Sequence, residues 1–159
     1  MSIWWSLHLR REAASVPLAR KLLLGTMETA GVDPEIAHDL SLALTEACAN
    51  AVEHGGSEGA GENYRVTAFI DGDTCRIEVT DSGPGFTRSP GGCDHLAPGT
   101  GGRPARRPAP AQDEHGRGLF LIEALTDHVR YRNRTGRNGA VISFDKILKW
   151  REDALLKAS

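Results

Sequence analysis

The stretch Leu44-Thr-Glu-Ala-Cys-Ala-Asn-Ala-Val-Glu-His-Gly55 is the part of the sequence that best indicates its fold. Glu46, Asn50 and His54 follow one another at helical spacing and therefore share one ridge of a helix. At about 100° per residue, this ridge falls beside the apolar stripe of the helix and not opposite it. Polar side chains in that position can line a cleft next to the core. The stripe consists of Leu40, Ala43, Leu44, Ala47 and Ala51.

A carboxylate and a carboxamide one helical turn apart suit a site of phosphoryl transfer. Asn50 offers an uncharged oxygen to Mg²⁺, and Glu46 can orient or deprotonate an attacking hydroxyl group. The same spacing also fits an ordinary amphipathic helix with solvated polar residues on its flank. The helix motif alone therefore leaves both interpretations open.

A second motif, Asp81-Ser-Gly83-Pro-Gly85, follows directly after a β-rich run. Its two glycines allow a sharp turn and a close approach of the backbone to a ligand. Asp81 can accept a hydrogen bond from an exocyclic amino group such as that of adenine. An ordinary turn remains the alternative. Arg88 breaks the dinucleotide-binding pattern, and no Gly-Lys-Ser/Thr follows as in a P-loop.

A third motif, His115-Gly116-Arg117-Gly118-Leu119, leads into an apolar helix. Free backbone N–H groups at such a helix start attract anions, including phosphates. Arg117 either adds positive charge there or points into solvent. A flexible loop before a plain core helix is the alternative. The conjunction of the three motifs, each on the required element, favours a nucleotide cleft.

Local signals predict elements in the order β-α-α-β-β-lid-α-β-β. Ser15-Val16-Pro17 and Asp33-Pro34-Glu35 are typical helix starts, and Gly31 is a typical helix stop. Asp71-Gly72-Asp73 predicts a hairpin turn. The expected strands are 4–9, 64–70, 75–79, 129–132 and 140–144, and the expected helices are 15–30, 33–55, 116–126 and a short tail at 147–156. This order predicts an α/β protein, more narrowly an α+β two-layer sandwich with helices on one face of a mostly antiparallel sheet.

The composition fits one domain over residues 1–159, with a long insert at about 86–115. The insert is rich in Gly, Pro and Arg, which indicates a functional lid or a disordered segment. The 19 basic and 21 acidic residues leave a net charge of −2, which gives no sign of a nucleic-acid or membrane surface. The three cysteines are widely spaced and form no C-x-x-C pair, which favours reduced thiols; they are Cys48, Cys75 and Cys93. With no apolar run long enough for a signal sequence or a membrane span, we expect a cytoplasmic protein.

The three motifs together resemble the GHKL superfamily, which shares the Bergerat or histidine-kinase-like ATPase fold. The first is similar to the N-box of that group, the second to its D-x-G-x-G motif, and Gly116 to Leu119 to its G-x-G-L motif. The resemblance in sequence is closest to the small bacterial anti-sigma-factor serine/threonine kinases, and two segments carry it, Leu44–Gly55 and Gly116–Val129. The resemblance covers nearly the whole chain.

This resemblance implies an ATP- and Mg²⁺-dependent kinase and a role for each motif residue. Asn50 would coordinate Mg²⁺, and Glu46 would act as the base on a substrate hydroxyl group. Asp81 would hold the adenine amino group. The remaining residues implied for the nucleotide site are His54, Gly83, Gly85, His115, Gly116, Arg117, Gly118 and Leu119. The implied partners are a sigma factor, a STAS-domain anti-anti-sigma protein and a second copy of the chain in a homodimer.

Two departures from the family pattern keep a second function open. Gly139 is followed by Ala140, whereas the family usually has Thr there, so one hydroxyl on the adenine side is missing. The insert is also longer than the family lid. A module that binds ATP but regulates its partner by contact alone is therefore the alternative to a kinase. A histidine kinase is disfavoured, because no helix pair with a phosphorylatable histidine precedes the first strand.

Overall fold

A computed structural model of the protein describes residues 2–54, 63–81, 114–133 and 139–152. The predicted insert lies almost wholly outside them. The elements in chain order are β1 (Ser2–Arg10), α1 (Ser15–Ala30), α2 (Pro34–His54), β2 (Asn63–Asp71), β3 (Thr74–Asp81), α3 (Glu114–Leu125), β4 (His128–Asn133) and β5 (Ala140–Ile147).

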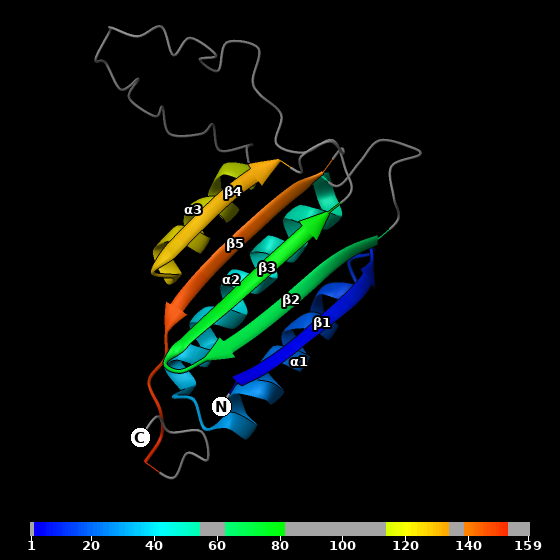
Figure 1. The fold of residues 1–159 in the computed structure, drawn as a ribbon. Helices are drawn as coiled ribbons and strands as arrows, with labels where there is room; N and C mark the ends of the chain where they lie inside the picture. The colour runs from blue at the N-terminus through cyan, green and yellow to red at the C-terminus, as the bar shows by residue number, and fades with distance from the viewer. Residues whose placement is uncertain (1, 55–62, 82–113, 134–138, 153–159) are drawn as a thin grey trace, which may run out of the picture.

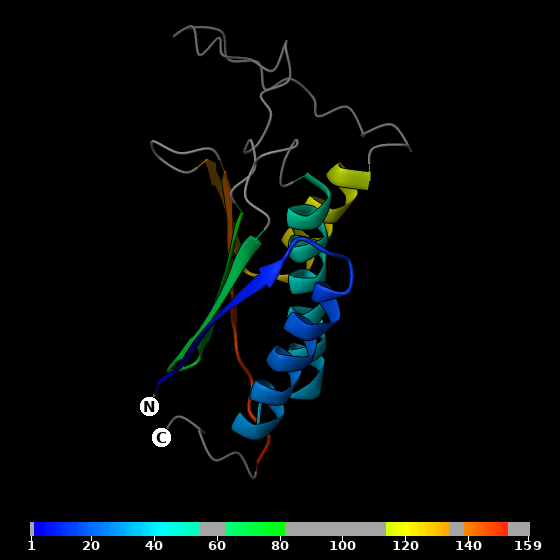
Figure 2. The same ribbon diagram turned by 90° about the vertical axis from the view of Figure 1, so that its right-hand side faces the viewer.

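The strands form one sheet in the order β1-β2-β3-β5-β4, and every neighbouring pair is antiparallel. Figure 1 shows the open face of this sheet, and Figure 2 shows the three described helices packed together on the other face. The predicted two-layer α+β architecture is therefore confirmed. The predicted hairpin joins β2 to β3, and Gly72 takes the left-handed conformation (φ 56°) in its turn.

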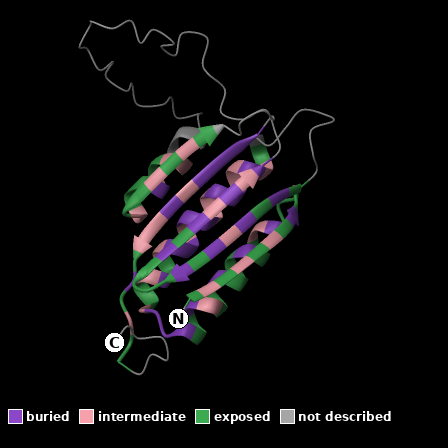
Figure 3. Ribbon diagram, in the orientation of Figure 1, coloured by how far each residue is buried: buried purple, intermediate pink, exposed green. Residues whose placement is uncertain are grey.

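The core lies between the sheet and the helices. Along β2 and β3 buried and exposed residues alternate, as the pleat of a half-covered strand requires (Figure 3). The inward residues meet the buried stripe of α2, which is the stripe that helical periodicity predicts. Burial of this apolar surface supplies the main stabilising free energy. The central residues are Leu40, Leu44, Ala47, Val66, Ala68, Ile77, Val79, Ile122 and Phe144.

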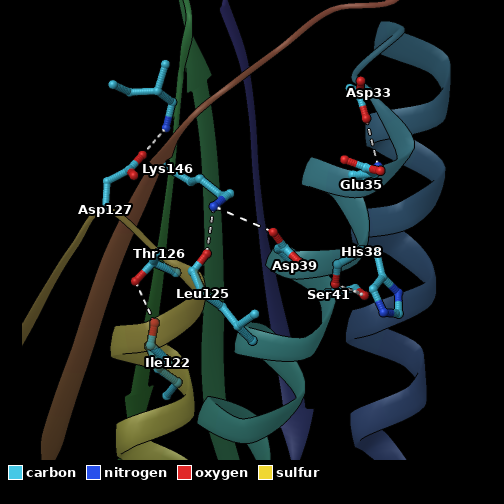
Figure 4. Close-up of polar contacts among 11 residues, drawn as sticks. Asp33, Glu35, His38, Asp39, Ser41, Ile122, Leu125, Thr126, Asp127 and Lys146 are labelled. Atoms are coloured by element: carbon cyan, nitrogen blue, oxygen red, sulfur yellow. Dashed lines mark hydrogen bonds and ion pairs between the residues drawn. The ribbon is translucent and has the colours of Figure 1, made fainter.

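Local capping explains where α1 ends and where α2 begins. Gly31 ends α1 in the left-handed conformation (φ 87°), and its N–H group donates to the Met27 and Glu28 carbonyls. Asp33 caps α2, because its Oδ1 accepts from the Glu35 N–H group at 2.8 Å (Figure 4). Both boundaries agree with the sequence-based prediction.

Lys146 connects the C-terminus of α3 to the N-terminal part of α2. Its ammonium group donates to the Leu125 carbonyl at 2.8 Å, at the C-terminus of α3, and lies 3.7 Å from the Asp39 carboxylate on α2 (Figure 4). A positive charge at a helix C-terminus is favourable. Because only 14% of the Lys146 side chain is exposed, this contact is part of the packing between the two helices and β5.

One predicted element is absent. The tail helix expected at 147–156 does not form in its described part, because Ile147 ends β5 and residues 148–152 are not helical. Their backbone groups pair instead with the α1–α2 connection, through Asp33 N–H to Lys149 O (2.7 Å) and Arg151 N–H to Gly31 O (2.8 Å). Residues 153–159 lie outside the described part. Helix α3 begins at Glu114, slightly before the predicted start, and ends at Leu125.

The directions of the helices and strands bring several of their ends together. The C-terminal ends of α2 and β3 lie at one end of the molecule with the start of α3 and the start of β5 (Figures 1 and 2). We call this end the motif end. No helix in the described ranges is long and apolar enough to cross a membrane.

Candidate functional site

Glu46 and Asn50 lie on α2 toward the motif end, beside the buried stripe. Both side chains are half-buried, whereas Ala47 and Cys48 between them have no exposed surface. The helical ridge that the sequence predicts is therefore present and lies next to the core. Half-buried polar groups in that position can contact a ligand while the helix remains packed on the sheet.

Gly118 brings α3 close to the Glu46 side chain. A Cβ atom built at this position would lie 2.9 Å from Glu46 Oε2, closer than real Cβ atoms approach other atoms. The space that a side chain would fill at residue 118 is thus used by the carboxylate. The structure joins the first and third motifs at this contact.

Asp81 lies at the end of β3 with only 8% of its surface exposed. Its Oδ1 accepts a hydrogen bond from the Ala140 N–H group at the start of β5, at 3.2 Å. Residue 140, where the sequence departs from the family pattern, is therefore a direct neighbour of the Asp81 carboxylate. A carboxylate has about four acceptor positions, so a buried carboxylate that is bonded to a backbone N–H can also accept from a ligand amino group.

A hydrogen bond to Leu119 connects the third motif to the sheet. The Leu119 carbonyl oxygen accepts a hydrogen bond from the Tyr131 hydroxyl on β4, at 3.1 Å. The start of α3 is thereby held on both sides, by β4 at Leu119 and by the close approach to α2 at Gly118. Sequence reasoning did not identify Tyr131, because its strand lies beyond the helix and carries no motif.

The remaining predicted site residues are described only in part or not at all. Gly83 and Gly85 lie outside the described residues. His54 is the last residue of α2, and His115, Gly116 and Arg117 lie in the first turn of α3, but their side chains are outside the described part. Their backbone positions place them at the motif end. Their roles remain predictions.

Sequence reasoning also missed a buried polar group next to the first motif. The Tyr64 hydroxyl on β2 lies 2.6 Å from the Ser15 hydroxyl on α1, within hydrogen-bond distance. Burial raises the pKa of Cys48 to about 12 and the pKa of Tyr64 to about 12. Both groups are therefore neutral at physiological pH. The inward position of Tyr64 in an alternating strand was the only signal in the sequence.

The donor groups at this site fit magnesium that arrives with a nucleotide. Within the described ranges, no three His, Cys, Asp or Glu side chains converge as a set of metal ligands. Magnesium in phosphoryl-transfer sites commonly takes one or two protein ligands and completes its shell with phosphate oxygens and water. The half-buried amide of Asn50 can supply one such ligand.

Comparison with known proteins defines the class. Residues 9–146 match the family model described as histidine kinase-like ATPase domain, and this match runs from the end of β1 into β5 and includes all three motifs. The chain belongs to the histidine kinase-like ATPase family.

Serine-protein kinases named RsbW are among the proteins similar to this chain. The chain is 32% identical to the serine-protein kinase RsbW of Oceanobacillus iheyensis over 121 residues, which cover 76% of this chain and 73% of that protein. It is 28% identical to RsbW of Bacillus subtilis over 129 residues, covering 81% and 78% of the two chains. The sequence relationship therefore extends beyond the motifs to most of the domain.

A solved structure shares the fold. The crystal structure of the RsbU and RsbW domains of Rv1364c from Mycobacterium tuberculosis aligns with a TM-score of 0.65 and 20% sequence identity. The alignment covers 93% of this chain but only 32% of that one. At this identity the likeness supports the fold alone.

Proposed function

We propose that this protein is a serine/threonine protein kinase and anti-sigma factor. It would sequester a sigma factor and phosphorylate a STAS-type anti-anti-sigma protein. The observation that carries the proposal is the half-buried Glu46 carboxylate, which lies one helical turn before Asn50 and against Gly118. A carboxylate so placed can take the proton of a substrate hydroxyl group. The similarity to RsbW serine-protein kinases supports the same reading.

The other described site residues have separate tasks in this proposal. Asn50 would contribute an oxygen to Mg²⁺, and the bound ion would offset negative charge on the phosphates. Asp81, oriented by the Ala140 N–H group, would accept the adenine amino group. The start of α3 would direct backbone N–H groups at the phosphates. Catalysis would then consist of positioning and electrostatic stabilisation.

Transfer of label from γ-labelled ATP tests the kinase function. The tagged chain is used to capture its partners from the native cytoplasm, and the mixture is incubated with Mg²⁺ and labelled ATP. We expect acid-stable label on serine or threonine of a small partner. We expect Glu46→Gln to bind ATP as the wild type does but to transfer no phosphate, and Asn50→Ala to lose Mg²⁺-dependent ATP binding.

The possible results separate the candidate functions. Transfer that survives Glu46→Gln would remove the general-base role. Acid-labile label on the chain itself would point to a histidine kinase. Label on no partner, with ATP still bound, would support the second candidate, a module that acts by contact alone. The methyl side chain of Ala140 beside Asp81 favours this candidate, because it supplies no hydroxyl to the adenine side.

Assembly and location belong to the same proposal. We infer from the family resemblance that the protein acts in the cytoplasm as a homodimer, with no direct contact to nucleic acid or membrane. Sedimentation velocity of the purified chain tests the dimer. A single species of monomer mass at micromolar concentration would contradict it.

A further inference from the structure

A pocket lies on the open face of the sheet, which is the face opposite the helices. Strands β3, β5 and β4 run side by side there, and their outward side chains surround the pocket (Figure 1). Its volume of about 540 Å³ is enough to admit a side chain of another molecule. The outward residues that line it are Arg76 and Glu78 on β3, Ser143 on β5, and Arg130 and Arg132 on β4.

An ion pair forms one wall of this pocket. The Arg132 guanidinium group lies 3.2 Å from the Glu78 carboxylate. Because β5 runs between β3 and β4, the Arg132 side chain crosses β5 to make this contact. The charge of Glu78 is thereby balanced by Arg132. The other two arginines of the pocket add positive charge that no lining residue balances.

The remaining polar groups of the pocket keep donors that other residues do not use. Arg76 donates from Nε to the Ser143 hydroxyl oxygen at 3.4 Å, which leaves its two terminal nitrogens. Ser143 accepts in this bond, so its own proton can go to another acceptor. Among the described residues, no acidic side chain pairs with Arg76 or Arg130. Donors from three side chains therefore line one pocket, and this arrangement suits a carboxylate.

An exposed aromatic pair lies beside the pocket on the same face. Trp4 on β1 and Phe69 on β2 are register partners, and 65% and 38% of their surfaces are exposed. Phe69 is in turn the register partner of Arg76. With strands about 4.8 Å apart, the pair lies about 10–15 Å from the middle of the pocket. An extended peptide covers that span with three or four residues.

We propose that this face binds a protein partner through an extended segment, which places a carboxylate in the pocket and an apolar side chain against Trp4 and Phe69. This inference goes beyond the proposed kinase function and does not depend on it, because none of these residues belongs to the candidate site. A guanidinium group can hold a carboxylate through two parallel N–H bonds. Exposed apolar patches with a polar rim are typical of protein–protein contacts.

The charge of the face favours an acidic partner over a second copy of this chain. The outward positions of the described strands carry more arginines than acidic residues, so a second copy would bring like charges together. The acidic residues within the face disfavour a nucleic-acid backbone, which carries closely spaced negative charges. The outward arginines and acidic residues are Arg10, Arg65, Arg76, Arg130, Arg132, Asp71, Glu78 and Asp145.

Selection of random eight-residue peptides, displayed on phage, against the full chain tests the proposal. Counter-selection against Ser143→Phe, in which a large side chain fills the pocket, removes peptides that bind elsewhere. We expect the remaining peptides to share an aspartate or glutamate three or four residues from an apolar residue. Peptides without an acidic residue, or no enrichment over counter-selection, would overturn the proposal.

Arg130→Gln and its control Arg65→Gln locate the binding site. Each change removes one exposed guanidinium group from the same face, but Arg65 does not line the pocket. Fluorescence anisotropy of a labelled synthetic copy of an enriched peptide gives its Kd. We expect the Kd to rise about tenfold in Arg130→Gln, because charge-assisted hydrogen bonds are lost, and less than twofold in Arg65→Gln. Equal effects of the two variants would show that only net charge matters, and would overturn the assignment of the pocket.

Arg130→Lys tests the geometry of the contact. Lysine keeps the charge but has no planar fork, so the Kd should rise about threefold, between the values of wild type and Arg130→Gln. A Kd equal to that of the wild type would contradict bidentate binding of a carboxylate. The three arginine variants should keep the wild-type circular dichroism and urea midpoint, because the changed side chains are exposed.

Competition experiments separate this face from the proposed kinase site and from other ligands. Mg²⁺–ATP should leave the peptide Kd unchanged, because Glu46 and Asn50 lie on α2, on the other side of the sheet (Figure 2). A wild-type protein without transferase activity would refute the kinase proposal, but peptide binding would still be measurable. Displacement of the peptide by a micromolar single-stranded oligonucleotide would assign the face to nucleic acid. Conversion of a dimer to a monomer by the peptide would assign it to a second copy, and either result would overturn the proposal.

Discussion

Glu46 and Gly118 share one small volume between α2 and α3. The carboxylate oxygen Oε2 of Glu46 lies 2.9 Å from the point where residue 118 would carry its Cβ atom. The nearest atom is the end of a flexible side chain and not backbone. A methyl group at residue 118 would therefore displace the carboxylate while leaving both helices in place.

Gly118→Ala should separate stability from activity. Alanine is favoured over glycine inside a helix by about 0.5–1 kcal/mol, so the free energy of unfolding should not fall by more than about 1 kcal/mol. Phosphotransfer should fall about tenfold or more, because Glu46 has to rotate away. Urea unfolding and transfer of γ-labelled phosphate measure the two effects.

Gly25→Ala is the control for this prediction. Gly25 lies in the interior of α1, and a Cβ atom there would meet no atom within 4 Å. The variant should be more stable by about 0.5–1 kcal/mol and should transfer phosphate at the wild-type rate. Wild-type activity of Gly118→Ala would show that the position of Glu46 is not critical.

Ala140→Thr should increase affinity for ATP. Residue 140 follows the same inward alternation as Ile142 and Phe144, so the new hydroxyl would stand near Asp81 on the predicted adenine side. One added hydrogen bond contributes about 0.5–1.5 kcal/mol, equivalent to about a 2- to 10-fold lower Kd. Equilibrium binding of a fluorescent ATP analogue measures the change. Ala140→Val has the same shape without the hydroxyl, and equal affinity of the two variants would exclude the hydrogen bond.

Lys146→Met should lower stability without affecting nucleotide binding. The change keeps most of the side-chain length and removes the donor to Leu125 O and the charge near Asp39. A hydrogen bond made by a charged group contributes about 1.5–3 kcal/mol, and the urea midpoint should fall accordingly. Lys149, whose side chain is exposed, provides the comparison: Lys149→Met should change stability by at most about 0.5 kcal/mol. Equal loss in the two variants would contradict the structural role of Lys146.

Alkaline pH should destabilise the fold through its buried thiols. Burial raises the pKa of Cys48 and of Cys75 from 9.0 to about 12. Above pH 9 the unfolded chain therefore loses protons that the folded chain retains, so the free energy of unfolding falls as pH rises. The stabilisation is complete below pH 9 and is lost between pH 9 and 12, at up to about 1.4 kcal/mol per pH unit for each thiol.

Urea unfolding at several pH values between 8 and 11 checks this slope. Cys75→Ala should make the decline with pH shallower, whatever the variant does to stability at pH 8. A decline of unchanged steepness would show that the Cys75 thiol does not contribute to it.

Local signals allowed most of the fold to be predicted. Asp33 and Gly31 act on backbone groups within a few residues of themselves, so the limits of α1 and α2 could be recognised without tertiary information. The conformation of the segment after Ile147 could not be recognised in this way. Its backbone partners at Gly31 and Asp33 are more than a hundred residues away in sequence, and its apolar residues also fit a helix.

In the candidate site, too, features set by local geometry were predictable and features set by packing between elements were not. Helical geometry alone places Glu46 and Asn50 on one ridge, so their juxtaposition was predictable. The approach of Gly118 to Glu46 and the bond from Ala140 to Asp81 depend on how α3 and β5 pack, which no local pattern reveals. Tyr64 was missed for a related reason, because a single inward tyrosine in a strand does not indicate which helix it contacts.

One of the groups that contact the Asp81 carboxylate, the Ala140 N–H, belongs to the main chain. Every amino acid except proline supplies an N–H group at residue 140. A substitution at this position can therefore change the side chain on the predicted adenine side while the hydrogen bond to the carboxylate is kept. The alanine found here, where the resemblance to the family predicts threonine, is a substitution of that kind.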